Sequence, residues 1–343
     1  MASSMSERPR PTRRAPTVND VARLANVSRQ TVSNVINAPE RVRESTRQRV
    51  EEAIATLEYH SNRLGRSLQG QSSRLIGYRI PPAQRGESTP ILDRFLHALT
   101  EAAREHGYQV LLFLPQDGQR EADSHEEMLS TATVDGLVLT DTTPEDPRVA
   151  FLARQQLPFV TFGRTRLDVV HPWVDVDGAA GVLAAVHHLV AAGHRRIAFV
   201  GPGETPAYAS ERLSGYREGM ADSGLAPDPA LELPLGTSGA DALRDLLALP
   251  SPPTAFIAAD DLTAIRLLET AQALGHVVGP DGLAIVGFDD IPLASFVRPA
   301  LTTIRQPIED VAHEIIRLLL ARMAGQQPEG VLLKPELVVR SSA

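Results

Sequence analysis

The sequence predicts a chain of two parts: a small all-α helix-turn-helix DNA-binding head and a larger α/β body with two doubly wound parallel sheets. Three observations lead to this fold class. Positive charge is concentrated at one end of the chain, short segments with helical periodicity lie within that end, and from residue 74 onward apolar runs alternate with amphipathic stretches. At 343 residues the chain is also too long for one ordinary domain.

The composition is that of a globular protein without a membrane segment. Hydrophobic residues make up 43% and charged residues 22% of the chain, and no run approaches the roughly 18 consecutive apolar residues of a membrane helix. The chain has no cysteine, which excludes disulfides and thiolate metal sites and fits a reducing cytosol. Residues 1–16 are basic and rich in proline, lack the apolar segment of a secretion signal, and are expected to form a disordered tail.

Charge is distributed unevenly along the chain. Residues 1–75 carry 13 arginines, no lysine and 7 acidic residues, a net charge of +6 in a chain of net charge −8, so the remainder carries −14. A cationic head favours contact with phosphate, and an acidic body disfavours non-specific binding to DNA. From charge alone, a solvated basic arm that binds no partner explains the pattern as well as a DNA-binding head does.

A first helix is expected directly after the tail. Thr17 can cap it, and Asn26 tolerates the left-handed conformation that would end it. Its apolar residues recur at the spacing of one buried stripe: Val18, Val21, Ala22 and Ala25. A third helix is expected over residues 44–57, through the apolar residues Val50, Ile54 and Leu57.

Between these two, a second helix turns long hydrogen-bonding side chains outward. Ser28 can cap it, its apolar side is Val32, Val35 and Ile36, and its outward residues are Arg29, Gln30, Ser33 and Asn34. Two helices joined by a tight turn form a helix-turn-helix. Arginine can donate two hydrogen bonds to guanine, and glutamine or asparagine can pair with adenine. A generic three-helix bundle is the alternative, but the position in the basic head favours DNA recognition.

The body alternates strand and helix patterns, which is typical of parallel sheets covered on both faces. The expected strands are 75–80, 110–114, 136–140, 159–162, 197–200, 255–258 and 284–287. The expected helices are 91–106, 121–132, 178–192, 211–223, 240–249 and 260–274. The run is too long for one sheet and is expected to divide near residue 175 into two similar lobes. Ligands of such folds bind beyond the carboxyl ends of the strands, so the cleft between the lobes is the expected site.

These segments resemble the lac repressor/galactose repressor family of bacterial regulators over about residues 17–342. In the head the resemblance is carried by the run Val18-x-Asp20-Val21-Ala22-x-x-Ala25-x-Val27-Ser28-x-x-Thr31-Val32-Ser33-x-Val35-x-Asn37. In the body it is carried by Gly193-His194-Arg195-Arg196-Ile197, Arg212-x-x-Gly215-Tyr216, Asp260-Asp261-x-x-Ala264, Gly287-Phe288-Asp289-Asp290 and residues 301–307. The resemblance implies a body shared with periplasmic sugar-binding proteins, and a homodimer that binds double-stranded operator DNA and a small-molecule effector.

The resemblance also assigns DNA contacts. Residues 61–73 match a hinge helix that folds on the operator, in which Leu68 wedges a base step open. Gly65 replaces the usual alanine and lowers helix propensity by about 1 kcal/mol, and a plain flexible linker is the alternative. Many members have arginine where this chain has Asn34. The full expected set is Thr17, Val18, Ser28, Arg29, Gln30, Thr31, Ser33, Asn34, Asn37, Tyr59, Asn62, Arg63, Arg66 and Leu68.

For the effector, the resemblance implies contacts from Arg212, Asp289, Asp260 and Arg164. The family commonly has asparagine in place of Asp260 and aspartate before Arg164. Trp173, the only tryptophan, could stack on the apolar face of a sugar, with core or hinge packing as its alternative. Because carboxylates only accept hydrogen bonds, they suit hydroxyl groups better than anions. A sugar or oligosaccharide inducer is therefore expected, with a purine or nucleoside corepressor as the alternative.

Neither catalysis nor a metal or cofactor is expected. His187 and His188 point to different sides of a helix and lack further ligands, and the glycine loop at residues 201–203 lacks the third glycine of a dinucleotide site. The paired carboxylates at 260–261 and 289–290 would fit glycoside hydrolysis only if they were suitably opposed. A sugar-transport protein, the rival from another class, would have an export signal and no basic head.

The expected domains are the helix-turn-helix at 17–60, the hinge and linker at 61–73, and the body at 74–343. The first lobe is expected at about 74–175 plus 306–333, and the second at 176–305 plus 334–343. Two bodies would hold two heads over half-sites about one helical turn apart. Effector binding would change lobe orientation, hinge folding and DNA affinity together, with reciprocal coupling. The choice between dimer and tetramer stays open.

Overall fold

A computed structural model describes residues 18–37, 41–57, 72–80, 90–114, 134–201, 207–234 and 239–343. The chain divides into two units, Met1–Ser73 and Arg74–Ala343, and each is described by itself. The expected tail, nearly all of the expected hinge, and the expected helix at 121–132 lie outside the described residues.

The described residues of the first unit form three helices: α1 (Val18–Leu24), α2 (Arg29–Asn37) and α3 (Glu44–Leu57). Their core is formed by Val21, Ala22, Ala25, Val32, Val35, Val50 and Ala53. Asn26 has a φ of +52°, which confirms the left-handed residue expected after α1. The Ser28 hydroxyl accepts a hydrogen bond from the Thr31 amide at 3.1 Å, which confirms the expected cap of α2. Ile54 and Leu57, expected to be buried, are partly buried at the edge of this core.

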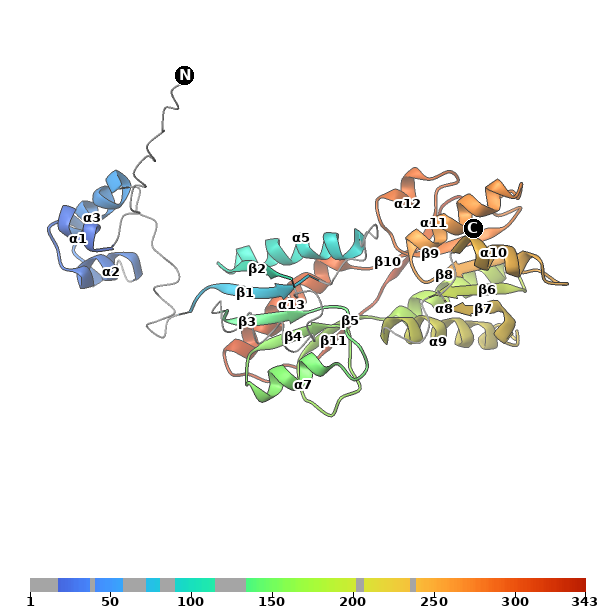
Figure 1. The fold of residues 1–343 in the computed structure, drawn as a ribbon, viewed down its shortest axis with the longest axis horizontal. Coiled ribbons are helices and arrows are strands. Elements are labelled where there is room, and N and C mark those ends of the chain that lie inside the picture. The colour runs from blue at the N-terminus through green and yellow to red at the C-terminus, as the bar shows by residue number, and fades with distance from the viewer. Residues whose placement is uncertain are drawn as a thin grey trace, which may run out of the picture. The chain divides into compact units, whose positions relative to one another are not determined.

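The first lobe of the body is a six-stranded parallel sheet in the order β11-β5-β4-β3-β1-β2. Its strands are β1 (Leu75–Arg79), β2 (Gln109–Phe113), β3 (Gly136–Leu139), β4 (Phe159–Phe162), β5 (Trp173–Val176) and β11 (Val331–Leu333). Helices α5 (Pro90–Glu105) and α13 (Ile308–Met323) pack together on one face, and α7 (Pro147–Arg154) packs on the other (Figure 1).

The second lobe has a six-stranded sheet in the order β12-β10-β9-β8-β6-β7, parallel except for β12. Its strands are β6 (Ile197–Gly201), β7 (Glu232–Pro234), β8 (Ala255–Ala258), β9 (Ala284–Asp289), β10 (Thr302–Arg305) and β12 (Glu336–Val338). One face is covered by α8 (Gly178–Ala191) and α9 (Ala207–Asp222). The other is covered by α10 (Gly239–Leu247), α11 (Asp261–Ala273) and α12 (Leu293–Phe296), with a short 3-10 helix at Pro229–Leu231 before β7.

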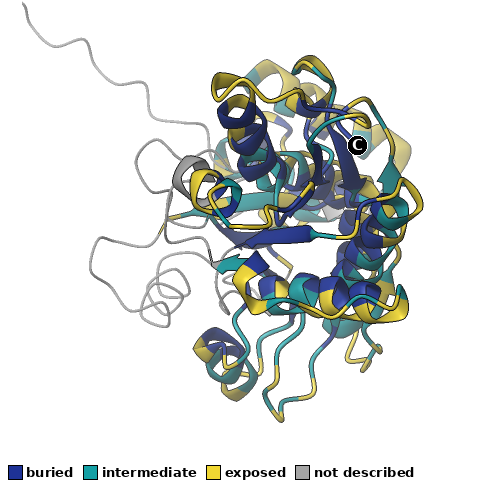
Figure 2. Ribbon diagram, turned by 90° about the vertical axis from the view of Figure 1, so that its right-hand side faces the viewer, coloured by how far each residue is buried: buried dark blue, intermediate teal, exposed yellow. Residues whose placement is uncertain are grey.

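The chain passes between the lobes after β5, after β10 and after β11. In both lobes the central strands are buried, whereas the edge strands β2, β11 and β12 are partly exposed and the helices expose their outer faces (Figure 2). The predicted α/β class with two sheets is thus confirmed. Strand β4 has the predicted bounds, and α9 begins four residues earlier than predicted, at Ala207.

Several elements were missed by sequence periodicity. Strands β5, β7, β10 and β12 are three or four residues long and contain charged residues or proline, and β11 has only three residues, so none of them forms the continuous apolar run that indicated β8. Helix α13 has apolar residues over much of its length, as expected for a helix buried between a sheet and another helix.

Helices α8 and α9 approach each other closely because glycines lie at their contact. A Cβ atom on Gly215 of α9 would overlap the carbonyl oxygen of Ala179 in α8, and one on Gly219 would lie 2.9 Å from Val186 Cβ. The backbone of α8 has little freedom to move, since Val182, Ala185 and Val186 are fully buried beneath α9. The glycines therefore set the position of α9 over the sheet.

The variant Gly215→Ala is expected to lower the free energy of unfolding by about 1–3 kcal/mol, because the added methyl group overpacks this contact. Ser214→Ala, at an exposed position of the same helix, is the matched control and should change it by less than about 0.5 kcal/mol. Urea unfolding followed by circular dichroism measures both. Equal stabilities of the two variants would contradict the close helix contact.

Candidate functional site

The polar side chains of the second lobe meet at the carboxyl ends of its strands. Asp260 follows β8 and begins α11, Asp289 is the last residue of β9, and Arg212 lies in α9, which follows β6. Because β6, β8 and β9 are parallel neighbours, their ends lie on one edge of the sheet. We call Tyr208, Arg212, Asp260 and Asp289 the arginine group.

Arg212 is the centre of this group. Its Nη1 donates to the carbonyl oxygen of Ala259, and its Nη2 lies 3.9 Å from Asp289 Oδ1. The guanidinium carbon lies 3.5 Å from the ring centre of Phe288 and 4.6 Å from that of Tyr208. Its Nε is buried and has no hydrogen-bond partner among the described residues. The side chain is thus oriented by its neighbours while retaining an unused donor.

Asp289 is a buried acceptor in a left-handed turn. Its φ is +113°, and Gln306 Nε2 donates to its Oδ1 at 2.6 Å. Burial raises the pKa of Asp289 to about 7; Asp260 acts in the same direction, whereas Arg212 and Gln306 oppose the shift. The carboxyl group therefore changes its charge near neutral pH.

Asp260 caps α11 and is only partly buried. Its Oδ1 accepts from the Thr263 amide at 2.8 Å and its Oδ2 accepts from the Thr263 hydroxyl at 2.9 Å. Each carboxylate oxygen has a second lone-pair direction. Asp260 can therefore cap the helix and accept from a ligand hydroxyl at the same time.

Tyr208 is an aromatic member of the group that sequence reasoning missed. It is 42% exposed and stacks on Arg212. Desolvation of its hydroxyl group nevertheless raises the pKa of Tyr208 to about 12, and Asp141, Asp260 and Asp289 act in the same direction. The phenol stays protonated at neutral pH and can donate. Only its position four residues before Arg212, on the same helix face, would have indicated this role.

Arg164 connects the two lobes. Its Nε donates to Asp175 of β5 at 2.9 Å, and its Nη2 donates to Glu211 of α9 at 2.7 Å. Burial raises the pKa values of Asp175 and Glu211, and Arg164 partly opposes both shifts. Arg164 therefore contacts Glu211, the residue before Arg212, and is not itself part of the arginine group.

The loop after β3 in the first lobe carries Asp141, whose charge acts on Tyr208. Asp141 has a φ of +53°, and the buried side chain of Arg148 donates to its carbonyl oxygen and to that of Thr140, each at 3.0 Å. Arg148 also pairs with buried Asp146 at 2.6 Å. Although burial acts in the opposite direction, Arg148 lowers the pKa of Asp146. This pair anchors the loop that presents Asp141.

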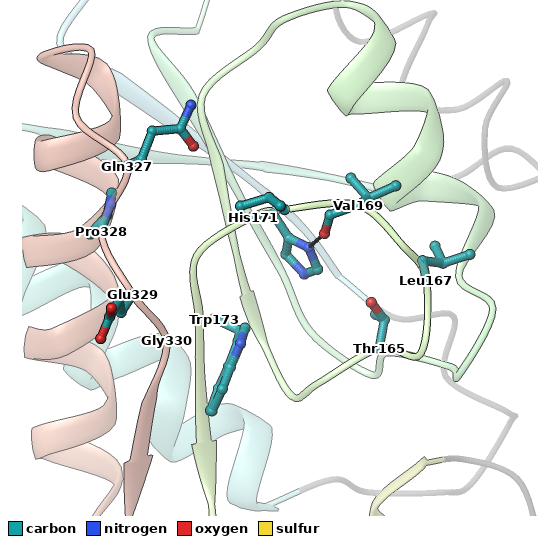
Figure 3. Close-up of a pocket in the computed structure, with 10 residues that line it drawn as sticks. Thr165, Leu167, Val169, His171, Trp173, Gln327, Pro328, Glu329 and Gly330 are labelled. Atoms are coloured by element: carbon teal, nitrogen blue, oxygen red, sulfur yellow. Dashed lines mark hydrogen bonds between the residues drawn. The ribbon is translucent and has the colours of Figure 1, made fainter.

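Trp173 does not join the arginine group. It is the first residue of β5, and the strand reaches the lobe crossover only three residues later. At a rise of about 3.3 Å per residue, Trp173 therefore lies well away from the crossover. Its indole lies against Gly330, where an added Cβ would overlap the ring. It lines a separate cavity of about 340 Å³ whose polar lining residues include Thr165, His171, Gln327 and Glu329 (Figure 3).

The first unit presents the expected DNA-reading residues on α2. Arg29 and Gln30 are exposed, Thr31, Ser33 and Asn34 are partly buried, and Gln30 Nε2 donates to Asn34 Oδ1 at 3.0 Å. Ser28 is exposed at the cap, and Val18 is partly buried in the core. The side chain of Asn37 is not described, and the remaining predicted contacts lie outside the described residues: Thr17, Tyr59, Asn62, Arg63, Arg66 and Leu68.

The described part of the chain lacks two features of other functional classes. It contains no group of three or more histidine, aspartate or glutamate side chains that could hold a metal ion. None of its helices is both long enough and apolar enough to cross a membrane.

Comparison with known proteins identifies both units. Residues 17–62 match the model of bacterial regulatory proteins of the lacI family, and residues 186–343 match the periplasmic binding protein-like domain. The HTH-type transcriptional regulator CelR of Thermobifida fusca is 33% identical over 96% of this chain and 99% of its own length. The chain belongs to the lacI family. It is a DNA-binding transcriptional regulator, as the resemblance of its motifs predicted.

Solved structures agree with this assignment to the lacI family. The complex of the transcriptional regulator CelR with cellobiose is 31% identical, covers 96% of this chain and all of its own, and has a TM-score of 0.73. The lac repressor dimer bound to operator and the anti-inducer ONPF is 27% identical, covers 96% of this chain and 99% of its own, and has a TM-score of 0.84.

Beside the arginine group, Asp261 is fully buried at the start of α11. Its Oδ1 accepts from the Thr303 hydroxyl at 2.5 Å, and its Oδ2 accepts from the Ile291 amide at 2.8 Å. Burial raises the pKa of Asp261 to about 8, and the charges of Asp289 and Asp290 act in the same direction. The folded protein therefore keeps a proton here that the unfolded chain releases near pH 4.

Because the folded-state pKa is the higher one, Asp261 destabilises the fold increasingly as pH rises from about 4 to about 8. Asp261→Asn removes this titration, so the stability of the variant relative to the parent protein should increase over this interval. Urea unfolding at several pH values measures the effect, with exposed Asp222→Asn on α9 as the charge control. Parallel pH dependences of parent and Asp261→Asn would contradict the assignment.

Proposed function

We propose that this regulator represses transcription as a homodimer on operator DNA and releases the DNA when a neutral sugar or oligosaccharide binds at the arginine group. The observation that carries the proposal is the combination of groups at one sheet edge. Arg212 is a fixed donor, Asp260 and Asp289 are acceptors, and Tyr208 offers an aromatic face beside them. This combination suits a molecule with several hydroxyl groups and an apolar ring face.

The charges around the site favour a neutral ligand. Asp141, Asp260 and Asp289 all act on Tyr208, and the only cation that acts on it there is Arg212, which already interacts with Asp289. An anionic sugar phosphate would therefore meet repulsion without an unpaired cation to offset it. The CelR relative whose structure contains cellobiose supports the same class of ligand.

The contact across the lobes supports a coupling route. Glu211, which accepts from Arg164 of the first lobe, directly precedes Arg212 on α9. A ligand that moves Arg212 would therefore change a contact with the first lobe, which begins the body and directly follows the proposed hinge at 61–73. Since coupling is reciprocal, effector and operator would lower each other's affinity by one common factor.

We also propose that the effector is not chemically changed and that the regulator acts in the cytoplasm.

A mobility-shift assay tests this function. Purified protein is mixed with the DNA upstream of its own gene, and glucose, cellobiose, adenine and a nucleoside are added separately. Release of the DNA by a sugar supports the proposal. Tighter binding on addition of adenine or the nucleoside would replace it by the corepressor alternative, and binding without preference over random duplex would overturn it.

Arg212→Met should keep operator binding and lose release by the sugar, because the fixed donor of the site is gone. Arg217→Met, on the same helix but in an exposed pair with Glu232, is the matched control and should respond like the parent protein. Effector concentrations for half-maximal release measure the difference. A shift of at least tenfold is expected for Arg212→Met, and equal values for the two variants would contradict the assignment.

Gln30→Ala should weaken operator binding by roughly 1–3 kcal/mol and reduce the preference over random duplex, since this exposed α2 side chain is proposed to read a base edge. Thr56→Ala, at an exposed position of α3, serves as its control. Fluorescence anisotropy with operator and random duplex at one salt concentration measures both affinities. If Gln30→Ala weakened binding to both duplexes equally, Gln30 would contact the DNA backbone instead of a base.

A further inference from the structure

The cavity beside Trp173 has no role in the function proposed above. It lies in the first lobe, between the loop that joins β4 to β5 and the loop that precedes β11 (Figure 3). None of the residues that line it belongs to the arginine group. Its volume of about 340 Å³ is at the lower end of the range of ligand cavities, about 300–1,000 Å³.

One wall of the cavity is a flat aromatic surface held in place from behind. The indole of Trp173 lies directly against Gly330 of the neighbouring chain segment, where any side chain would displace it. In Figure 3 the indole is on the Gly330 side of the cavity, and His171 and Thr165 are on the opposite side. The ring's other side faces the cavity as a stacking surface that is shared with Arg164, whose guanidinium carbon lies over the ring at 5.6 Å from its centre.

Polar groups surround this ring. The hydroxyl oxygen of Thr165 is buried and lacks a hydrogen-bond partner within the described part of the chain, which is costly for a buried polar atom. The imidazole of His171 is oriented by a 2.9 Å hydrogen bond from Nδ1 to the Val169 carbonyl oxygen. Gln327 and Glu329 are exposed at the opposite loop.

The charges at the cavity limit the class of ligand. Burial lowers the pKa of His171, so this ring is neutral at neutral pH. Glu329 is then the only charged residue among those that line the cavity. The nearby cation of Arg164, which lies over the Trp173 ring, is already paired with Asp175 and Glu211. Anions are therefore disfavoured. An indole ring surrounded by a hydroxyl, an amide and a carboxylate group suits a ligand ring with an apolar face and several hydroxyl groups.

We propose that this cavity is a second carbohydrate site that binds one neutral sugar ring on Trp173, with Thr165 hydrogen-bonded to a ring hydroxyl group. It differs from the proposed effector site in lobe, in residues and in the source of its aromatic surface. Its existence does not depend on the arginine group being the effector site.

The experiment uses Trp173 as its own reporter, because the chain has no other tryptophan. The full-length protein with Arg212→Met, in which the first site is disabled, is titrated with glucose, cellobiose and choline while tryptophan emission is recorded. A saturable change with either sugar is expected. No saturable change with glucose or cellobiose overturns the proposal, and so does a response to choline alone, which would indicate a cation site instead.

Two variants in the same background test the geometry. Thr165→Val should weaken sugar binding about tenfold without lowering the melting temperature, because it removes a hydroxyl that has no partner in the unbound protein. Gly330→Ala should abolish sugar binding, since the new methyl group would displace the Trp173 indole from its position. Gln326→Ala, exposed beside the cavity but not lining it, should bind like its parent.

The outcomes separate the two sites. Loss of sugar release from the operator in Arg212→Met, with the Trp173 signal retained, supports both proposals. A Trp173 signal that disappears with Arg212→Met and is present in the parent protein would mean that Trp173 reports only the first site, which overturns the second site alone. Unchanged affinity in both Thr165→Val and Gly330→Ala would also overturn it.

Discussion

The buried guanidinium group of Arg212 is the interaction on which the candidate site depends. A buried charge is tolerated only when it is paired and hydrogen-bonded, and Arg212 finds its partners in several elements. It donates to the end of β8, faces the carboxylate at the end of β9, and stacks on Phe288. Its stem lies 3.2 Å from the position that a Cβ on Gly178 of α8 would take. One side chain thereby joins two strand ends to two helices.

At the same edge of the sheet, different surroundings give three aspartates different pKa values. Asp290 accepts from Arg305 and Arg340 at 2.7 and 2.6 Å, and these bonds lower its pKa although burial opposes them. Asp261 has only neutral donors and its pKa is raised to about 8. Asp289 lies between these cases, with Arg212 nearby and a pKa of about 7. Adjacent carboxyl groups therefore hold different charges at neutral pH, which determines which of them repel an anion.

An ion pair between the lobes lies near this edge. Arg164 links β5 to α9 at the residue before Arg212, and its guanidinium carbon also lies 5.6 Å from the Trp173 ring centre. A residue of the first lobe thus lies between the arginine group and the cavity beside Trp173. Such a chain of contacts provides a physical basis for coupling once two discrete arrangements are demonstrated.

Local sequence determined the head helices, the left-handed Asn26, the Ser28 cap, the alternation of strands and helices, and the edge at which Arg212, Asp260 and Asp289 meet. Each depends on periodicity or on backbone preferences within a few residues, or on the rule that parallel strands end at one edge. Tertiary structure alone decided that Arg164 bonds Glu211, that Trp173 packs on Gly330, and that the charge of Asp141 acts on Tyr208. These partners are brought together by packing between segments far apart in the chain, and no local pattern encodes such a pairing.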